Sequence, residues 1–241
     1  MLTILNNIKT SQNLVHGPTK FTILNAKTLM FLFIFPLYAT TTFLFFPQHS
    51  QANSLITKEK AIKNFPPRQI IAEFQENLLE TMKKTKFTPI DERFQKLKHH
   101  ISRTFHIPLM AHMVVKEYWK NSGKTEKEKF VNTFLRYNAA YLASLLHSYS
   151  GQSFKFESSS LGPQGTTIIR TTLEDPDGSI VKIAYILKNF SGDWRAIDVI
   201  LDNGISEMKM RQSEYHKVLK KSGITGLRQL LEAKIQHLLA E

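Results

Sequence analysis

Apolar residues recur at intervals of three and four along residues 66–121. This spacing places them on one face of an α-helix, so it predicts helices that each bury a single stripe. Three such repeats start near Pro67, Ile90 and Pro108. Pro67 suits the first turn of the first helix, where its missing N–H leaves no helical bond unmade.

The longest predicted helix begins near Thr125. Glu128 follows three residues later, which is the spacing of a capping box at a helix start. The apolar stripe of this helix is rich in aromatic residues, namely Phe130, Phe134, Tyr137, Tyr141, Leu145 and Tyr149. The helix therefore presents an aromatic face to whatever covers it.

From residue 153 the chain changes to short runs rich in Thr, Ile, Val and Phe, which are typical of β-strands. Two turn signals, EDPDGS and NFSGD, interrupt these runs. Four strands are predicted, near residues 153–160, 166–174, 179–188 and 193–202. Their short connections favour an antiparallel meander.

Two further helices are predicted at the end of the chain, over Ile205–Lys221 and Gly226–Ala240, and Gly223 suits the end of the first. Helices followed by strands and then by helices indicate an α+β fold. In such a fold the helices pack on one antiparallel sheet.

The two last strands each have one apolar side, because side chains alternate between the faces of a sheet. The residues of this side are Val181, Ile183, Tyr185 and Leu187 in the third strand and Ile197, Val199 and Leu201 in the fourth. If the aromatic helix covers this side, the interior is either filled or hollow. Composition alone favours a filled interior, because aromatic stripes usually pack in solid cores.

Residues 1–52 have the pattern of a secretory signal. Three lysines and no acidic residue precede an uncharged apolar stretch over 28–46, and the small residues of SQA at 50–52 suit a cleavage site. We predict a signal peptide over 1–52 and one α+β domain over 53–241. The alternative is an uncleaved membrane anchor, since roughly 20 apolar residues span a bilayer. A proline and three consecutive threonines within the stretch weaken this membrane-anchor alternative.

Composition narrows the partners of an exported domain. The 241 residues include no cysteine, so stability would come from a hydrophobic core and not from disulfides. The formal net charge of +12 falls to +9 without the three lysines of the signal segment. Export argues against nucleic acid and favours anionic lipid headgroups or an acidic docking partner. A basic surface that is merely solvated is the alternative.

Common catalytic and cofactor motifs are missing from the sequence. It has no glycine-rich phosphate loop, no cysteine-based metal spacing and no nucleophile-elbow serine. The four histidines His99, His100, His106 and His112 lack the three- or four-residue spacing that places two ligands on one helix face. We therefore predict no metal site and no cofactor, and we assign these histidines to packing or to the basic surface.

Asp198 lies in the middle of the apolar fourth strand. A carboxylate facing a cavity would have a raised pKa and could act as a general base, with Tyr185 on the neighbouring strand as an oxyanion donor. The alternative is a structural acid that caps a backbone turn or pairs with Arg170, Arg195 or Arg211. No second acid or histidine stands at a defined spacing, so the structural role is favoured.

Three segments carry a family pattern: TFHIPLMAHMVVKEYW, EKFVNTFLRYNAAYLASLLHSYSGQSFKF and WRAIDVILDNGIS, the last followed by Arg211, Tyr215 and GLRQLLE. Together they resemble the MlaC family of periplasmic lipid carriers. Within it, YSGQSF and IDVILDNGIS are most similar to the hopanoid-associated HpnM branch. The chain departs from the pattern at HMVVKEYW, where related chains tend to have a glycine and Lys116–Glu117 stand here.

The resemblance implies a non-enzymatic lipid-binding component of an ABC-type transport system in the Gram-negative envelope, located in the periplasm. It also implies a helical layer against a curved four-stranded sheet, as in nuclear-transport-factor-like folds, with lipid tails inside and the headgroup at the mouth. The implied partners are a phospholipid or hopanoid, a membrane-anchored ABC transporter complex with its lipid-docking subunit, and an outer-membrane lipid donor or acceptor.

A carrier needs an apolar lining, because exposing an acyl chain of roughly sixteen carbons to water costs on the order of 10 kcal/mol. We predict such a lining from Phe105, Leu109, Met113, Phe134, Tyr137, Tyr141, Leu145, Val181, Ile183, Tyr185, Ile197 and Val199. Asp198 would then anchor its strand to the NGIS turn. Two alternatives stay open: a small-molecule enzyme of cone-shaped α+β fold with Asp198 as base, and a non-carrier envelope interaction subunit with a solid core.

Overall fold

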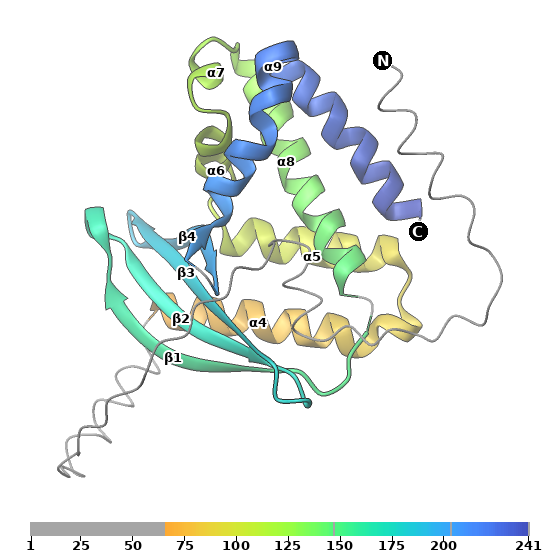
Figure 1. The fold of residues 1–241 in the computed structure, drawn as a ribbon, viewed down its shortest axis with the longest axis vertical. Coiled ribbons are helices and arrows are strands. Elements are labelled where there is room, and N and C mark those ends of the chain that lie inside the picture. Colours follow the sequence, from red (N-terminus) through yellow and green to blue (C-terminus); the bar gives the residue numbers. More distant parts are fainter. Residues whose placement is uncertain (1–65, 147, 203, 241) are drawn as a thin grey trace, which may run out of the picture.

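The computed structural model describes residues 66–146, 148–202 and 204–240. A curved antiparallel sheet lies against helix α4 (Pro66–Lys84), and the other helices stack beyond α4 (Figure 1). The signal peptide predicted over 1–52 lies outside the described residues. Across the described ranges, no helix combines the length and the apolarity needed to cross a bilayer.

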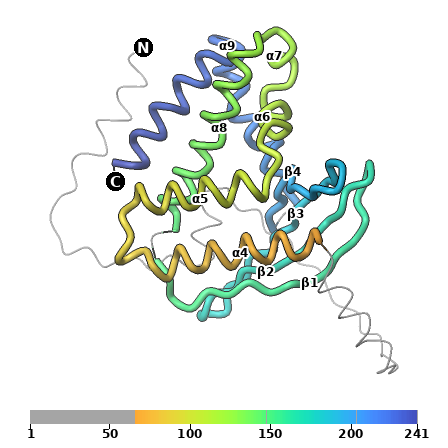
Figure 2. Tube along the Cα trace, turned by 180° about the vertical axis from the view of Figure 1, so that it is seen from behind, coloured from red at the N-terminus to blue at the C-terminus, as the bar shows by residue number. Residues whose placement is uncertain are grey.

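The first two helices follow the predicted stripes. α4 buries Ile71, Phe74, Leu78 and Met82, and α5 (Ile90–Thr104) buries Phe94, Leu97 and Ile101. A short 3-10 turn, η1 (Thr85–Phe87), joins them. Seen from behind, α4 lies along β1 and β2 and α5 runs above it (Figure 2). α4 thus lies along the first strands of the sheet, and α5, α6 and α9 contact the sheet at β4.

The third predicted helix is divided in two, α6 (Ile107–Val115) and α7 (Glu117–Lys120). Lys116 separates them with a positive φ of 46°. Glycine adopts such a backbone conformation at little cost, whereas a residue with a Cβ is strained there. The break thus falls where the sequence departs from the family pattern that it resembles.

The long helix α8 spans Lys124–Leu145. The predicted stripe ran to Tyr149, which is wrong at this end, because the helix stops at Leu145 and Tyr149 is exposed beyond it. The capping box predicted at Thr125 is wrong, because Gly123 is the N-cap residue and no side chain caps the helix. The helix begins one residue before Thr125, which puts that threonine inside the first turn. Its aromatic stripe is buried at Phe130, Phe134 and Tyr137.

The sheet is an antiparallel meander in the order β1-β2-β3-β4-β5. Its strands are β1 (Ser153–Leu161), β2 (Thr167–Glu174), β3 (Ile180–Phe190), β4 (Asp193–Leu201) and β5 (Ile205–Ser206). The α+β class and the first four strands were predicted. The prediction of four strands was one short, because β5 is a two-residue strand that pairs with the end of β4.

A bulge in β4 corrects the predicted pattern of its faces. Leu187 lies opposite Ala196 and Ile186 lies opposite Asp198, so Ile197 has no partner in β3. An extra residue in one strand interrupts the alternation of side chains. Ala196, which is fully buried, therefore lies opposite the buried Leu187 at the position predicted for Ile197.

The last helix, α9 (Glu207–Ala240), joins the two predicted C-terminal helices. It contains one non-helical residue, Gly223, with a φ of 61°, so the predicted break at this glycine is confirmed. The helix starts at Glu207 and not at Ile205, because Ile205 and Ser206 pair with β4.

Candidate functional site

Two adjoining cavities, of about 200 and about 180 Å³, lie between the helices and the inner face of the sheet. They have five lining residues in common: Phe74, Phe105, Leu142, Val199 and Leu201. These shared residues come from α4, from the α5–α6 junction, from α8 and from β4. The two cavities thus form one divided hollow.

Most of the lining is hydrocarbon. The larger cavity adds Ile101, Ile107, Met110, Leu145 and Val181, and the smaller adds Leu78, Met82, Leu146, Leu173 and Ile183. The inward residues of β3 follow the alternation of a strand with one buried face. Such walls suit an apolar ligand held by burial alone.

The end of α8 supplies the wall opposite the sheet. Tyr141 and Leu145 lie four residues apart, on the same face of the helix, and both line the larger cavity. Burial raises the pKa of the Tyr141 hydroxyl to about 12, so this side chain is neutral at physiological pH. The aromatic stripe thus adds no charge to the cavity.

A buried polar contact holds α4 against the sheet. The Gln75 amide nitrogen donates to Thr171 Oγ1 at 2.8 Å and to the Tyr185 hydroxyl at 3.3 Å. Burial raises the pKa of Tyr185 to about 12, so its hydroxyl is also neutral. Since Tyr185 lines the smaller cavity, this contact forms part of the cavity wall.

Charged groups meet the larger cavity at the first turns of α9, where Glu207 and Arg211 line it. The buried Arg211 guanidinium lies 2.9 Å from Glu214 Oε2 and 3.5 Å from Glu207 Oε2. It also lies over the rings of Tyr137 and Tyr141, at 5.5 and 5.4 Å from their centroids. These pairings let a buried arginine keep its charge beside hydrocarbon. The hollow therefore has one charged end, and most of the rest of its lining is apolar.

Seven of the twelve residues predicted to line the cavity do so: Phe105, Tyr141, Leu145, Val181, Ile183, Tyr185 and Val199. They come from the helical layer and from two strands, so the tertiary structure brings both layers together at one hollow. Contact of these residues with lipid stays a prediction.

The other five predicted residues lie outside the cavity walls: Leu109, Met113, Phe134, Tyr137 and Ile197. On α6 the lining residues are Ile107 and Met110, and Leu109 lies on a different face of the helix. Met113 lies about one turn beyond Met110, past the part of α6 that lines the cavity. Phe134 and Tyr137 precede the part of α8 that reaches the cavity. Ile197 is displaced by the β4 bulge.

Sequence reasoning missed the contribution of α4. Phe74, Leu78 and Met82 line the cavities and belong to an apolar stripe that the sequence showed clearly. The signal was present, but the cover of the sheet was assigned to the aromatic helix alone. The polar end at Glu207 and Arg211 was also missed, because a charged pair on a helix gives no sign of facing a cavity.

Asp198 makes the contacts expected of a structural anchor. Its Oδ1 accepts from the backbone N–H of Val199 at 2.8 Å and of Met208 at 3.2 Å, and its Oδ2 accepts from the Ser206 hydroxyl at 2.5 Å. These bonds join β4 to β5 and to the start of α9. Asp198 lies opposite Ile186 and Tyr185 opposite Val199, so Asp198 and Tyr185 point to different faces of the sheet.

The three arginines considered as partners of Asp198 bond elsewhere. Arg170 donates to Ser160, Arg195 pairs with Asp193 and Arg211 pairs with Glu214. The anchoring role of Asp198 therefore depends on backbone and hydroxyl donors instead of an arginine.

Two of the clustered histidines have packing contacts. His106 Nδ1 accepts from the Leu109 N–H at 3.1 Å, which caps α6, and its ring stacks on Phe190. His112 stacks on Trp119. In the part of the chain that the structure describes, no group of three or more His, Cys, Asp and Glu residues could hold a metal ion.

Residues 72–233 match the family described as MlaC protein. Over 118 residues the chain is 28% identical to the "Intermembrane phospholipid transport system binding protein MlaC" of Haemophilus influenzae, an overlap of 47% of this chain and 55% of that protein. The chain thus spans about half the length of this curated relative.

A solved structure has a similar fold. It is the phospholipid-binding protein from Ralstonia solanacearum in complex with a phospholipid, with a TM-score of 0.61 and 15% sequence identity. The overlap covers 70% of this chain and 97% of that one. At this identity the likeness shows a shared fold. The family match extends over well more than half of the sequence, and the chain therefore belongs to the MlaC family.

Proposed function

We propose that this chain is a non-enzymatic carrier that holds lipid hydrocarbon in the two adjoining cavities. The observation that carries the proposal is the apolar hollow between α4, α8 and the sheet. One acyl chain of roughly sixteen carbons costs on the order of 10 kcal/mol to expose to water, so a lipid crosses an aqueous gap only inside such a lining. Membership of the MlaC family and the phospholipid bound by the Ralstonia protein support this cargo class.

The setting we propose is the periplasm, between inner and outer membrane, as part of an ABC-type lipid transport system. The Haemophilus relative is named an intermembrane phospholipid transport system binding protein, which supports this setting. The proposed partners are a membrane-anchored transporter complex with its docking subunit and an outer-membrane donor or acceptor. The cargo is a phospholipid or, if the chain belongs to the HpnM branch, a hopanoid. The curved sheet and helical layer would be of nuclear-transport-factor-like type.

Two observations argue against the alternatives. Both carboxylate oxygens of Asp198 accept hydrogen bonds, and its side chain points to the opposite face from Tyr185, so the pair cannot act on one substrate. An interaction subunit with a solid core is disfavoured by the hollow itself.

The test is to purify the exported protein, extract it with organic solvent and identify the extract by mass spectrometry. We expect a phospholipid or a hopanoid to co-purify, and the stripped protein to take up the same lipid from vesicles. A preparation that holds no lipid, and that takes up none from vesicles of phospholipid with or without hopanoid, would overturn the proposal. If the protein instead turned over a small molecule, and Asp198→Asn abolished that activity while leaving the fold intact, the enzyme alternative would be established.

A further inference from the structure

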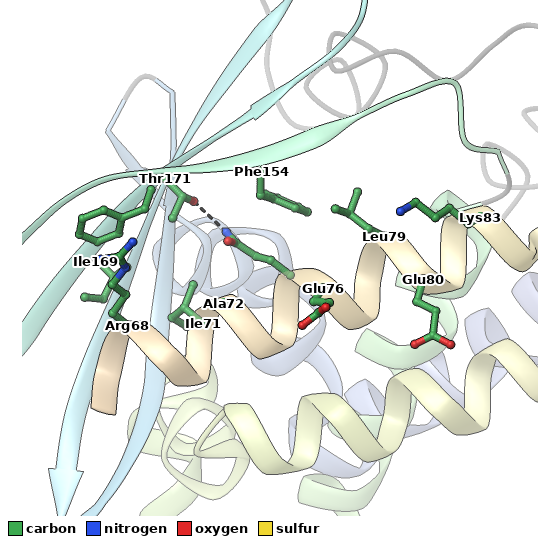
Figure 3. Close-up of a pocket in the computed structure, with 12 residues that line it drawn as sticks. Arg68, Ile71, Ala72, Glu76, Leu79, Glu80, Lys83, Phe154, Ile169 and Thr171 are labelled. Carbon is green, nitrogen blue, oxygen red and sulfur yellow. Dashed lines mark hydrogen bonds between the residues drawn. The ribbon is translucent and has the colours of Figure 1, made fainter. Parts of the chain in front are cut away.

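A third hollow lies outside the core, between α4 and the first two strands. It is a groove of about 620 Å³ whose apolar walls come from Ile71, Ala72, Leu79, Phe154, Phe156 and Ile169. Its charged lining residues are Arg68, Glu76, Glu80 and Lys83, and the Arg68 guanidinium lies over the Phe156 ring, 3.9 Å from its centroid. Figure 3 shows Glu76 and Glu80 on α4 turned away from Phe154, so the part of the groove next to Phe154 is free of carboxylates. α4 thus has a hollow on each side.

The groove and the smaller inner cavity share a wall. Phe154 lines both of them. Beside it, Gln75 lines the groove and donates to Tyr185, which lines the inner cavity. The same amide donates to Thr171, which also lines the groove (Figure 3). The Phe154 ring and the Gln75 amide therefore both lie between the groove and the smaller inner cavity.

The sizes of the three hollows suit a route by which a hydrocarbon chain enters the inner cavities from the groove. The two inner cavities, at about 200 and about 180 Å³, together fall near the lower end of the range of ligand pockets, which begins at roughly 300 Å³. The groove is larger than both, and β1 beside it is an edge strand that pairs only with β2. Two ordinary hydrogen bonds are a small barrier compared with exposing an acyl chain to water.

We propose that the groove between α4 and β1 is a binding site for a hydrocarbon chain of the cargo on its way to the inner cavities. The latch of this route is Gln75, whose two hydrogen bonds to Thr171 and Tyr185 hold α4 against the sheet. When α4 moves off β2, the two Gln75 bonds open and the groove joins the smaller cavity past Phe154. This inference rests on the proposed carrier function and adds to it the path of loading.

The groove is tested by filling it from a position that does not touch the inner cavities. Ala72 lines the groove and neither of the inner cavities. Its neighbour Glu73 is exposed and lines none of the three hollows. We expect Ala72→Trp to slow uptake of a fluorescent phospholipid from phosphatidylglycerol vesicles roughly tenfold, because the ring occupies the site. Glu73→Trp should take up lipid at the wild-type rate, and the bound amount at equilibrium should be equal in all three proteins.

The latch is tested by removing both partners of its inner bond. In Gln75→Leu/Tyr185→Phe the Tyr185 hydroxyl is removed together with its donor. The Thr171 hydroxyl loses the Gln75 donor and keeps its own bond to the Ile183 carbonyl at 3.5 Å. We expect uptake to be roughly tenfold faster, as the loss of about two hydrogen bonds predicts. The matched control is Gln69→Leu, because Gln69 lies on the same helix and donates at 3.1 Å to Glu73 on its exposed side.

Wild-type uptake rates in both Ala72→Trp and the latch variant would overturn the groove while leaving the carrier function intact. Absence of uptake by the wild-type protein would overturn the carrier function and the groove together. A slower rate with an unchanged bound amount is the expected result for Ala72→Trp, and a faster rate is the expected result for the latch variant. A purely structural role of Gln75 would change the urea midpoint without changing the rate.

Discussion

The two halves of α8 carry one continuous stripe and have different surroundings. In the first half Phe130 and Phe134 are fully buried, and the neighbouring Thr133 and Arg136 bond to Glu232 of α9, each at 2.7 Å at closest. In the second half Tyr141, Leu142 and Leu145 line the cavities. The first half is solid and the second is hollow.

The difference lies in what covers the helix. The first half runs beside the second part of α9, whose Leu227, Leu231 and Ile235 are fully buried (Figure 1). Side chains of two helices interdigitate and leave little space. The second half faces a curved sheet with α4 beside it, and space remains between the layers. An aromatic stripe is thus a core or a cavity wall according to its partner.

The largest effect is expected in the solid half. Phe134→Ala should lower the free energy of unfolding by about 3–5 kcal/mol, because it opens a void in a close-packed region. Urea denaturation measures the loss. Lipid bound per folded molecule should be unchanged, since Phe134 lines neither cavity. Reduced binding by the folded variant would break the distinction between the halves.

A smaller loss is expected at the junction of β4 with α9. Asp198→Ala removes the acceptor of three hydrogen bonds and should cost about 2–3 kcal/mol in urea denaturation. Asp193→Ala, on the same strand, should cost less than about 1 kcal/mol, because its pair with Arg195 is exposed. Equal losses in the two variants would contradict the anchoring role of Asp198.

In the hollow half the effect should appear in binding. Leu142 lines both cavities, so Leu142→Trp should reduce the bound lipid about tenfold, with a smaller loss of stability than Phe134→Ala. Fluorescence titration with a labelled phospholipid measures it. Asn132→Trp is the control, because Asn132 is an exposed residue of the same helix. If Leu142→Trp binds as well as this control, the second half of α8 does not line the lipid site.

The smallest effect concerns pH at the polar end. Burial, with smaller contributions from Asp198 and Glu214, raises the pKa of Glu207 above its usual 4.5, although Arg211 acts to lower it. The folded state therefore binds this proton more tightly, and the stabilisation is present below pH 4.5 and lost as pH rises through the folded pKa. Between about pH 4 and about pH 7 the wild type should lose stability relative to Glu207→Gln, and urea denaturation at the two pH values measures the difference.

Glu214 gives the contrast. Burial acts to raise its pKa, but Arg211 and Lys234 lower it below the usual value. Its stabilisation is therefore present above pH 4.5 and lost as pH falls, so the wild type should gain stability relative to Glu214→Gln as pH rises. If stability changed with pH in the same direction in both comparisons, the assignment of Glu207 as the more buried of the two acids around Arg211 would be contradicted.

Much of the architecture could be predicted because it depends on local periodicity. The stripe of Phe74, Leu78 and Met82 predicted α4, the alternation in Val181, Ile183 and Tyr185 predicted the inner face of β3, and Gly223 predicted the break in α9. The capping box at Thr125 and the placement of Ile197 failed. A helix start depends on which residue first leaves extended geometry, and a bulge depends on the pairing of two strands.

The sequence by itself determined the elements, the α+β class and the family, because each follows from spacing or from motifs along the chain. Only the tertiary structure decided which apolar residues surround empty space, since a buried leucine has the same spacing against a helix as against a cavity. Leu142 and Phe134 show the reason. Both lie on one helix, and the element that packs opposite each of them makes one a cavity wall and the other part of a solid core.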